Sequence, residues 1–533
     1  MKKKSVYGKN KIPKSPIPMR SVTTGTNNHS KLKTNYNMNG VIIQFFHWYH
    51  EGNLWNEFTE RCSYLKSLGF TAVWFPPATK CVLGKEGRGY DVYDSYDLGE
   101  FDQKGGVATR YGTREEYLLA IDRAHELGMS VYADIVMNHR MGGDEMEAVT
   151  VHQVKEENRN ERIGEPFEAK AFTQFTFPGR NGKYSQFVWN YTCFNGIDCV
   201  QKDGEELKGI FKIHNEFGED WNQTVSREFG NYDYLMGANV EYRNPYVAGE
   251  MKKWIKWYLE TTNADGLRLD AVKHISVDFL QEWIAYVKTE LKPDCFILGE
   301  FWKDEAEKIS HFSDQIREMI SCFDVPLHYN FFTASEKGKD YNLSEILKGS
   351  FLEKKPVFSV SFVENHDTQQ LQSLESTVQD WFKPLAYAVI LLMEEAYPCV
   401  FYPDLFGAEY TDLKEGKEVK IIMPKVEILP QLLEARQKFA YGEQINYFDH
   451  PNCIAWMRKG DNDHAGCIVI LSNSDEGCKD IELGKENANS VYKDFTDQSD
   501  HEIRTDENGK ARFTVNARSV SVWIRASGIT RIQ

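Results

Sequence analysis

The amino-acid sequence predicts a (β/α)8 barrel, the TIM-barrel fold, with one inserted domain after the third strand and a C-terminal antiparallel β-sandwich. Short apolar segments of strand character alternate with segments whose apolar residues repeat at helical spacing, and this happens eight times. The alternation is interrupted once, between about residues 141 and 230, and it ends near residue 430. A doubly wound open sheet is the competing arrangement. No glycine-rich phosphate loop follows a first strand, which weakens that alternative.

The eight predicted strands are short apolar runs. Strands of a parallel sheet are covered on both faces, so they read as nearly continuous hydrophobic stretches. The predicted strands are residues 40–48, 70–77, 130–139, 264–271, 294–301, 322–329, 356–365 and 398–407.

Several of the intervening helices have recognisable ends. Residues 53–69 carry an apolar stripe and stop at Gly69. The next helix begins after Thr113, and Glu116 stands three residues on, so the pair predicts a capping box. Pro245 is suited to the first turn of the helix that resumes the pattern after the interruption.

These patterns divide the chain into four parts. The barrel comprises residues 39–140 and 231–430. Residues 141–230, rich in Gly, Asn and aromatic residues, form the inserted domain. Residues 431–533 contain short alternating strands without helices, which predicts the β-sandwich. Residues 1–38 are rich in Lys, Pro, Ser, Thr and Asn, and we expect a disordered basic tail.

Composition excludes several classes of protein. The formal net charge is -16, and it is unevenly spread because the first 50 residues hold nine basic and no acidic residues. An acidic body argues against nucleic-acid binding. No run approaches the ~20 apolar residues of a membrane helix, and no apolar signal-peptide core follows the N-terminal lysines. The ten cysteines are scattered, as is typical of free thiols. We expect a cytoplasmic protein without a membrane partner, acting as a monomer.

Polar side chains gather where four predicted strands end. In barrels of this class the active site lies at the carboxyl ends of the strands. The residues at these ends are Asp134, Asn138 and His139 on the third strand, Arg268, Asp270, Lys273 and His274 on the fourth, Glu300 and Trp302 on the fifth, and Glu364, Asn365, His366 and Asp367 on the seventh.

Arg268 and Asp270 stand two residues apart on one strand. Side chains at this spacing point the same way, about 6.5–7 Å apart along the strand. An arginine placed there holds the aspartate ionised and oriented, as a carboxylate nucleophile requires. Taken alone, the pair fits a structural ion pair equally well.

The other carboxylates also have structural explanations when each is considered alone. Asp134 alone is more typical of a structural hydrogen-bonding group than of a catalyst, and Glu300 could cap the helix that follows it. Individual histidines such as His139 and His366 are usually satisfied loop residues. Their coincidence at four strand ends favours a shared active site.

Several carboxylates without a redox or phosphate motif suggest glycoside hydrolysis and no organic cofactor. Retaining enzymes of this kind place a nucleophile and an acid/base carboxyl about 5–5.5 Å apart. A metal-dependent barrel enzyme such as a sugar isomerase would also use Asp, Glu and His at strand ends, so it stays as an alternative.

Four short motifs resemble the signature regions of the α-amylase family, glycoside hydrolase family 13, in the family's order. They are DIVMNH (134–139), GLRLDAVKH (266–274), GEFW (299–302) and FVENHD (362–367). The segments GYDVYDSYDLGEF (89–101) and NYDYLM (231–236) resemble the liquefying bacterial branch. The resemblance runs from about residue 40 to the C-terminus, and it implies internal cleavage of α-1,4-glucans with retention of configuration.

The resemblance also implies roles for individual residues. Asp270 would be the nucleophile, Glu300 the general acid/base and Asp367 a third carboxylate that binds sugar hydroxyls. Tyr90 would stack on the reacting glucose. The residues implied to bind substrate are Tyr90, His139, Arg268, Lys273, His274, Trp302 and His366.

Relatives in this branch bind calcium between the insertion and the barrel, which implies a ligand set of Asn138, Asp233, Asn239 and the backbone of His274. Calcium prefers charged oxygen ligands. In this chain, amides stand where aspartates are common, which makes a calcium site doubtful. The amide positions are Gln186, Asn222 and Asn239.

Besides the metal-dependent barrel enzyme, three functions remain open at this point. The first is an α-amylase that hydrolyses starch, glycogen or maltodextrins internally. The second is an exo-acting maltooligosaccharide-forming enzyme or a 4-α-glucan transglycosylase with the same chemistry. The third is a catalytically silent glucan-binding protein, against which the presence of all three carboxylates speaks.

Overall fold

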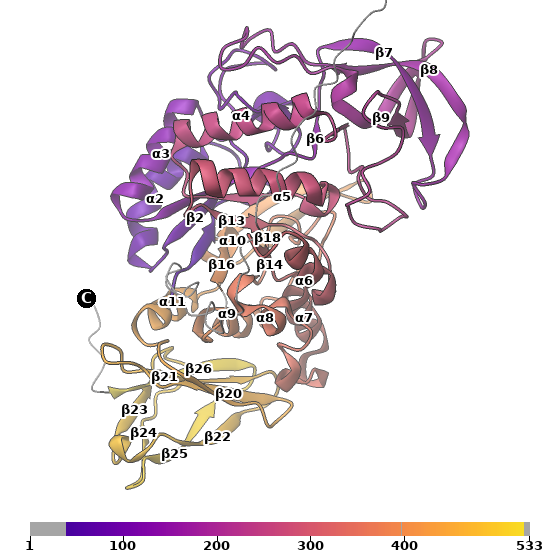
Figure 1. Ribbon diagram of the computed structural model, residues 1–533. Coiled ribbons are helices and arrows are strands. Elements are labelled where there is room, and N and C mark those ends of the chain that lie inside the picture. Colours follow the sequence, from indigo (N-terminus) through magenta and orange to yellow (C-terminus); the bar gives the residue numbers. More distant parts are fainter. Residues whose placement is uncertain (1–38, 396, 527–533) are drawn as a thin grey trace, which may run out of the picture. The chain divides into compact units, whose positions relative to one another are not determined.

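The computed structural model describes residues 39–395 and 397–526, and its centre is a closed barrel of eight parallel strands. Figure 1 shows these strands among the helices that surround them. The order around the barrel is β1-β16-β15-β14-β13-β12-β5-β2. The strands are β1 (Ile42–Gln44), β2 (Ala72–Phe75), β5 (Ser130–Ile135), β12 (Gly266–Leu269), β13 (Phe296–Gly299), β14 (Ser321–Phe323), β15 (Ser359–Phe362) and β16 (Tyr397–Phe401).

This architecture confirms the predicted fold class. Each strand overlaps its predicted segment. Every residue of β2, β12, β13 and β15 is buried, as expected for strands of a parallel sheet that is covered on both faces. The strands are shorter than the predicted segments.

Two predicted strands end early in helices. The segment 322–329 leaves the sheet after Phe323, because the Asp324 carboxylate accepts a hydrogen bond from the Leu327 N–H and so caps a helix. The segment 398–407 likewise leaves the sheet after Phe401 and enters a single helical turn.

Helices connect the strands. Thr113 and Glu116 form the predicted capping box, and Pro245 occupies the predicted first turn. The main helices are α2 (Leu54–Ser67), α3 (Arg114–Glu126), α4 (Pro245–Thr262), α5 (Val277–Tyr286), α6 (Ala306–Gln315), α7 (Val325–Lys337), α9 (Lys383–Leu392) and α11 (Leu429–Lys438), with the short α8 (Phe351–Lys354) and α10 (Tyr402–Phe406). Helix α11 packs on α9 and runs eight residues past the predicted barrel end at residue 430.

The insertion is an antiparallel sheet of six strands in the order β10-β7-β8-β9-β11-β6. Its strands are β6 (His139–Arg140), β7 (Glu145–Val154), β8 (Arg162–Gln174), β9 (Phe194–Lys202), β10 (Glu205–Ile213) and β11 (Ala238–Val240). Because β6 and β11 belong to this sheet, it extends beyond residues 141–230 at both ends.

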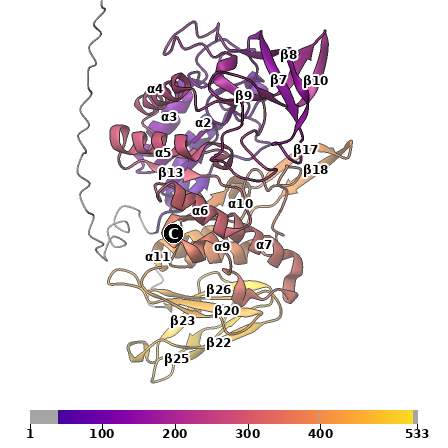
Figure 2. The same cartoon turned by 45° about the vertical axis from the view of Figure 1, so that its right-hand side comes forward.

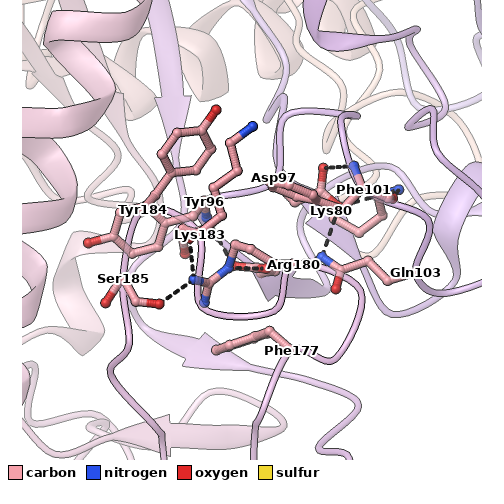
Figure 3. Close-up of polar contacts among 12 residues, drawn as sticks. Lys80, Tyr96, Asp97, Phe101, Gln103, Phe177, Arg180, Lys183, Tyr184 and Ser185 are labelled. Carbon is pink, nitrogen blue, oxygen red and sulfur yellow. Dashed lines mark hydrogen bonds and ion pairs between the residues drawn. The ribbon is translucent and has the colours of Figure 1, made fainter.

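A buried ion pair connects the insertion to the long loop that follows β2, and a second buried pair lies within that loop. Arg180 of the insertion lies with its Nε 2.7 Å from Asp94 Oδ2, and both side chains are almost fully buried. Lys80 Nζ lies 3.5 Å from Asp97 Oδ2. Gln103 donates hydrogen bonds to both Asp94 and Asp97, so it joins the two pairs, as Figure 3 shows for Lys80, Asp97 and Gln103.

The C-terminal domain contains two sheets that share one apolar core, which confirms the predicted β-sandwich. The larger sheet has the order β19-β20-β21-β26-β23-β24, and β22 pairs with β25 in the smaller one. The strands are β19 (Gln444–Tyr447), β20 (Cys453–Arg458), β21 (Cys467–Ser472), β22 (Gly477–Glu482), β23 (Val491–Asp494), β24 (Ile503–Arg504), β25 (Lys510–Val515) and β26 (Ser519–Arg525).

A hairpin that the sequence did not predict follows the last barrel strand. It consists of β17 (Ala408–Lys414) and β18 (Lys417–Met423), and it projects from the barrel in Figure 2. Another short pair, β3 (Lys80–Cys81) and β4 (Val92–Asp94), lies in the loop after β2.

Three further predictions concern the tail, membrane-spanning helices and the cysteines. The predicted tail, residues 1–38, lies outside the described residues. Over the part of the chain that the structure covers, no helix is both long and apolar enough to cross a bilayer. All ten cysteines are free thiols.

Candidate active site

Arg268 lies at the centre of a cluster of carboxylates. Its Nη1 lies 2.7 Å from Asp270 Oδ1 and 2.9 Å from Asp134 Oδ1. Its Nη2 lies 3.0 Å from Glu300 Oε2. Strand β12 pairs with β5 on one side and β13 on the other, so this buried guanidinium reaches carboxylates from three neighbouring strand ends. The prediction that Arg268 and Asp270 point the same way is confirmed.

Glu300 is also fixed by the backbone that follows Asp270. The Ala271 N–H donates to Glu300 Oε2 over 3.0 Å. Ala271 adopts a left-handed conformation with φ 49°, which is unfavourable for a residue with a side chain. The surrounding contacts hold this strained turn, and it aims the amide at the carboxylate.

Asp367 completes the group of carboxylates on the side of β15. Burial of its carboxyl raises its pKa to about 6, and the Arg268 guanidinium opposes that shift. Burial and the nearby Glu300 also raise the pKa of Asp270, and the Arg268 guanidinium opposes that shift. One arginine therefore faces more negative charge than it can neutralise.

His366 is a neutral imidazole with a defined direction. Gln44 Nε2 donates to His366 Nδ1 over 3.1 Å, which leaves the proton on Nε2. Burial lowers the pKa of His366 to about 3. Its Nε2 lies 3.5 Å from Asp367 Oδ2, so the Nε2–H is available beside that carboxylate.

Three planar side chains form one wall of the site. The rings of Tyr90 and His366 stack with centroids 5.1 Å apart, and Trp48 stacks on both, at 5.9 Å from Tyr90 and 6.2 Å from His366. The Tyr90 hydroxyl donates to Asp134 over 2.8 Å, which fixes the ring. Such a wall suits the apolar face of a sugar.

His139 is placed behind Tyr90. Its Nε2 lies 2.9 Å from the Tyr90 carbonyl oxygen, and burial lowers its pKa to about 4. The neutral ring donates from Nε2, so Nδ1 is an acceptor, and no described side chain or backbone group pairs with it. His139 therefore orients Tyr90 and offers one acceptor.

Lys273 and Trp302 lie together on the other side of Glu300. Lys273 Nζ donates to the Trp302 carbonyl over 3.1 Å and lies 3.5 Å from a Glu228 carboxylate oxygen. Trp302 Nε1 donates to the Tyr329 hydroxyl over 3.3 Å. These contacts fix the positions of the Lys273 ammonium group and the Trp302 indole at the rim of the site.

His274 has a different environment from that predicted for a substrate-binding residue. Its imidazole is buried, and Nδ1 lies 2.7 Å from the Tyr232 carbonyl oxygen. The ring also contacts the Tyr232 ring at 4.1 Å. We therefore assign this side chain to the contact with the insertion.

The residues predicted around calcium form a network of amides. Asn138 donates to Asn239 over 3.2 Å, and Asn239 donates to Asn195 over 2.8 Å. Asn195 in turn donates to Asp233 over 2.7 Å. Gln186 is exposed and Asn195 lies in the cluster, so the predicted place of Gln186 in this network was wrong.

Calcium does not fit this network. Asp233 is its one carboxylate, and both oxygens already accept hydrogen bonds from Asn222, with Asn195 adding another. Among the described residues, no group of three or more His, Cys, Asp or Glu side chains gathers as a metal site. Calcium sites are built mainly from carboxylate and carbonyl oxygens that face the ion.

The sequence did not point to Gln44 and Trp48, and Asp134 was expected among the strand-end residues but, taken alone, as a structural hydrogen-bonding group. Asp134 accepts hydrogen bonds from Trp74, Tyr90 and Arg268, so it organises the site. Gln44 is the last residue of the first barrel strand and Trp48 follows it closely, at a strand end that carries no carboxylate. Applying the strand-end argument to every strand would have found them.

Comparison with known proteins places this chain among glucan-degrading enzymes. The family model described as "Alpha amylase, catalytic domain" matches residues 51–427. The chain is 46% identical over 490 residues to the cytoplasmic alpha-amylase of Escherichia coli strain K12, covering 91% of this chain and 99% of that protein. It is 40% identical over 490 residues to the alpha-amylase of Geobacillus stearothermophilus, covering 91% and 87%.

Two further comparisons concern product type and fold. A glucan 1,4-alpha-maltohexaosidase of Bacillus sp. strain 707 is 40% identical, with 91% of this chain and 92% of that protein covered. A crystal structure of an alpha-amylase from Geobacillus thermoleovorans, complexed with acarbose, has a TM-score of 0.61 at 19% identity, covering 92% of this chain and 98% of that one. At that identity the likeness shows the fold alone.

Proposed function

Since the chain belongs to the α-amylase family of glycoside hydrolases, we propose that its site hydrolyses α-1,4-glucosidic bonds by a retaining double displacement. The observation that carries this proposal is the bridging of Asp270 and Glu300 by one guanidinium. This bridging supports a nucleophile, Asp270, and an acid/base group, Glu300, that act on the same glycosidic bond.

In the first step, an Asp270 oxygen attacks the anomeric carbon and forms a covalent glucosyl ester. Glu300 gives its proton to the glycosidic oxygen as that carbon–oxygen bond breaks, and the shortened glucan leaves. In the second step, Glu300 takes a proton from water, whose oxygen displaces Asp270. Two inversions restore the α configuration.

The neighbouring residues support these steps. Arg268 keeps Asp270 oriented and favours its charged form against the effect of burial. The Nε2–H of His366 and the carboxylate of Asp367 lie together where they can bind hydroxyls of the reacting glucose. Tyr90, stacked on His366, supplies the apolar surface.

We further propose that cleavage is internal and that the substrates are long α-1,4-glucans such as starch, glycogen or maltodextrins. Two relatives are named alpha-amylase, and one is named for maltohexaose release, so product length needs its own test. Viscosity and reducing sugar should be followed together on soluble starch. Internal cleavage predicts a steep fall in viscosity before much sugar appears; a parallel course of the two would favour exo action.

We also propose that the enzyme works without calcium. The support is the amide network around Asp233, in which amide N–H groups donate to the Asp233 carboxylate and to a neighbouring amide oxygen. The likeness to the cytoplasmic relative supports a cytoplasmic site of action, and a monomer remains our proposal for the oligomeric state.

A further inference from the structure

Glu364 is a carboxylate at the end of β15 that the proposed reaction does not use. It lies three residues before Asp367, and its side chain is buried. Its Oε2 lies 3.2 Å from Lys383 Nζ, and its Oε1 accepts a hydrogen bond from the Val378 N–H over 2.6 Å. These contacts join the start of the segment that follows β15 to residue 378 and to the first residue of α9.

Lys383 is anchored by a second buried carboxylate. Its Nζ lies 2.7 Å from Asp404 Oδ1, and the Tyr387 hydroxyl donates to Asp404 Oδ2 over 2.5 Å. Asp404 belongs to α10, which directly follows β16, so the network connects the ends of two paired barrel strands with α9. Because a buried ion pair adds little net stability over apolar packing, stability alone does not explain this network.

The residue after Glu364 fixes the backbone of Asp367. Asn365 Oδ1 accepts hydrogen bonds from the backbone N–H groups of Asp367 and Thr368, over 2.9 Å and 3.0 Å. Since Asn365 shares a peptide bond with Glu364, a displacement of Glu364 moves this turn and Asp367 with it.

A histidine joins the same two ends of the segment independently. His328 Nδ1 lies 2.7 Å from the Val363 carbonyl oxygen, and its Nε2 lies 2.8 Å from Ser376 Oγ. The two ends of the segment 363–378 are therefore connected twice, once through this imidazole and once through the Glu364 carboxylate.

We propose that Glu364 is a positioning residue for the reaction. Its carboxylate closes the segment that carries His366 and Asp367, and so keeps these two side chains at the reacting glucose. The inference rests on the proposed function, because it assigns the group that places two of its residues. Contacts with the reacting sugar are strongest in the transition state, so a small displacement lowers kcat more than it raises KM.

Two substitutions at Glu364 test the proposal. Glu364→Met has a similar length but no acceptor, so it loses the contacts with Val378 and Lys383, while Lys383 keeps its contact with Asp404. Glu364→Gln retains an oxygen for the Val378 N–H and turns its amide toward Lys383, so it keeps one contact of the two.

The matched control removes a buried charge from the other end of the barrel. Arg436 on α11 is buried and donates to the carbonyls of Asn39 and Gly40, which precede β1. Arg436→Met should therefore destabilise the fold far from the active site. Thermal unfolding of all three variants shows that each is folded and how far its stability has changed.

The measurement is kcat and KM for maltoheptaose with each purified full-length variant, well below its unfolding midpoint. We expect Glu364→Met to lower kcat about tenfold or more, and Glu364→Gln to lower it about threefold, with KM changed less than about twofold in both. Arg436→Met should keep the kcat and KM of the wild type.

Three results would overturn the inference. A wild-type kcat in either Glu364 variant, or a loss confined to KM, would show that this side chain places no group that acts in the transition state. A fall of kcat in Arg436→Met as large as that in Glu364→Met would assign the effect to lost stability. Equal losses in the two Glu364 variants would show that the bond to Val378 is not what holds the segment. Failure of the proposed function is distinguishable, since the wild type would then not hydrolyse maltoheptaose.

Discussion

At the scale of single residues, Arg268 determines what the site can do. It lies within 3.0 Å of carboxylate oxygens from Asp134, Asp270 and Glu300, and Asp367 adds a fourth acid whose Oδ2 lies 3.5 Å from His366 Nε2. Repulsion among these buried carboxylates opposes folding. Their shared contacts with Arg268 nevertheless keep a nucleophile and proton-transfer groups together.

Replacing the nucleophile should separate binding from catalysis. Asp270→Asn keeps the shape and an oxygen for Arg268, yet an amide cannot form the glucosyl ester. We expect kcat on soluble starch to fall about 10⁴-fold or more, with maltoheptaose binding by calorimetry retained. Asp278→Asn, an exposed aspartate on α5, is the control and should leave kcat unchanged. Undiminished hydrolysis by Asp270→Asn would refute its assignment as nucleophile.

Burial of the ionised Asp367 carboxylate should lower the free energy of unfolding at neutral pH. Its pKa is raised to about 6 in the folded state, so folding favours the protonated form between about pH 4 and 6. Above pH 6 the carboxylate is ionised in both states and the full cost of burying it is present; below pH 4 it is neutral in both.

Asp367→Asn should therefore raise the free energy of unfolding at pH 7 by about 1–2 kcal/mol, and the gain should vanish near pH 4. Urea unfolding at both pH values measures this difference. A variant less stable than the wild type at pH 7 would contradict the explanation.

At the scale of elements, the junction between the insertion and the barrel is held by side chains. The buried pair of Arg180 and Asp94 connects the insertion to the loop after β2. Arg180→Met should leave Asp94 buried without its cation and destabilise the protein by about 3–5 kcal/mol. Lys183→Met, in the same loop but with an exposed partner contact to Glu100, should cost at most about 1 kcal/mol. Equal losses in urea unfolding would show that burial is not the cause.

The amide network predicts how the protein responds to calcium. The midpoint of thermal unfolding should be the same in chelator and in millimolar calcium. Changing Asn195, Asn222 and Asn239 together to Asp supplies three more carboxylates around Asp233, which should create calcium-dependent stability and measurable binding by calorimetry. A wild-type protein that binds one calcium ion and gains stability from it would refute the metal-free assignment.

Element boundaries were predictable where a local signal exists. The Thr113 capping box and Pro245 give their helices recognisable starts, and both are present in the structure. The sixth strand ends early because Asp324 caps α7. The apolar segment 322–329 predicted a longer strand despite this capping residue. The insertion sheet was not predicted because β8 is largely exposed and mixes polar with apolar residues, so its periodicity is weak.

At the scale of the whole molecule, barrel topology explains why residues 230 positions apart meet. The parallel strands present their carboxyl ends at one face, and this let the sequence bring Asp134, Asp270, Glu300 and Asp367 together. Trp48 was missed because its strand carries no carboxylate. The stacking of Tyr49 on Tyr410 of the hairpin could not be predicted, since it depends on how the segment after β16 packs beside β1.

The central claim is that Asp270 and Glu300 perform a double displacement on an α-1,4-glucan. Proton NMR of the first products from a long α-1,4-glucan, recorded before mutarotation, tests it directly, with and without chelator. The account predicts that new reducing ends appear as the α-anomer at equal rates in both conditions. Initial formation of the β-anomer would contradict this claim, whereas loss of activity in chelator would contradict only the proposal that the enzyme works without calcium.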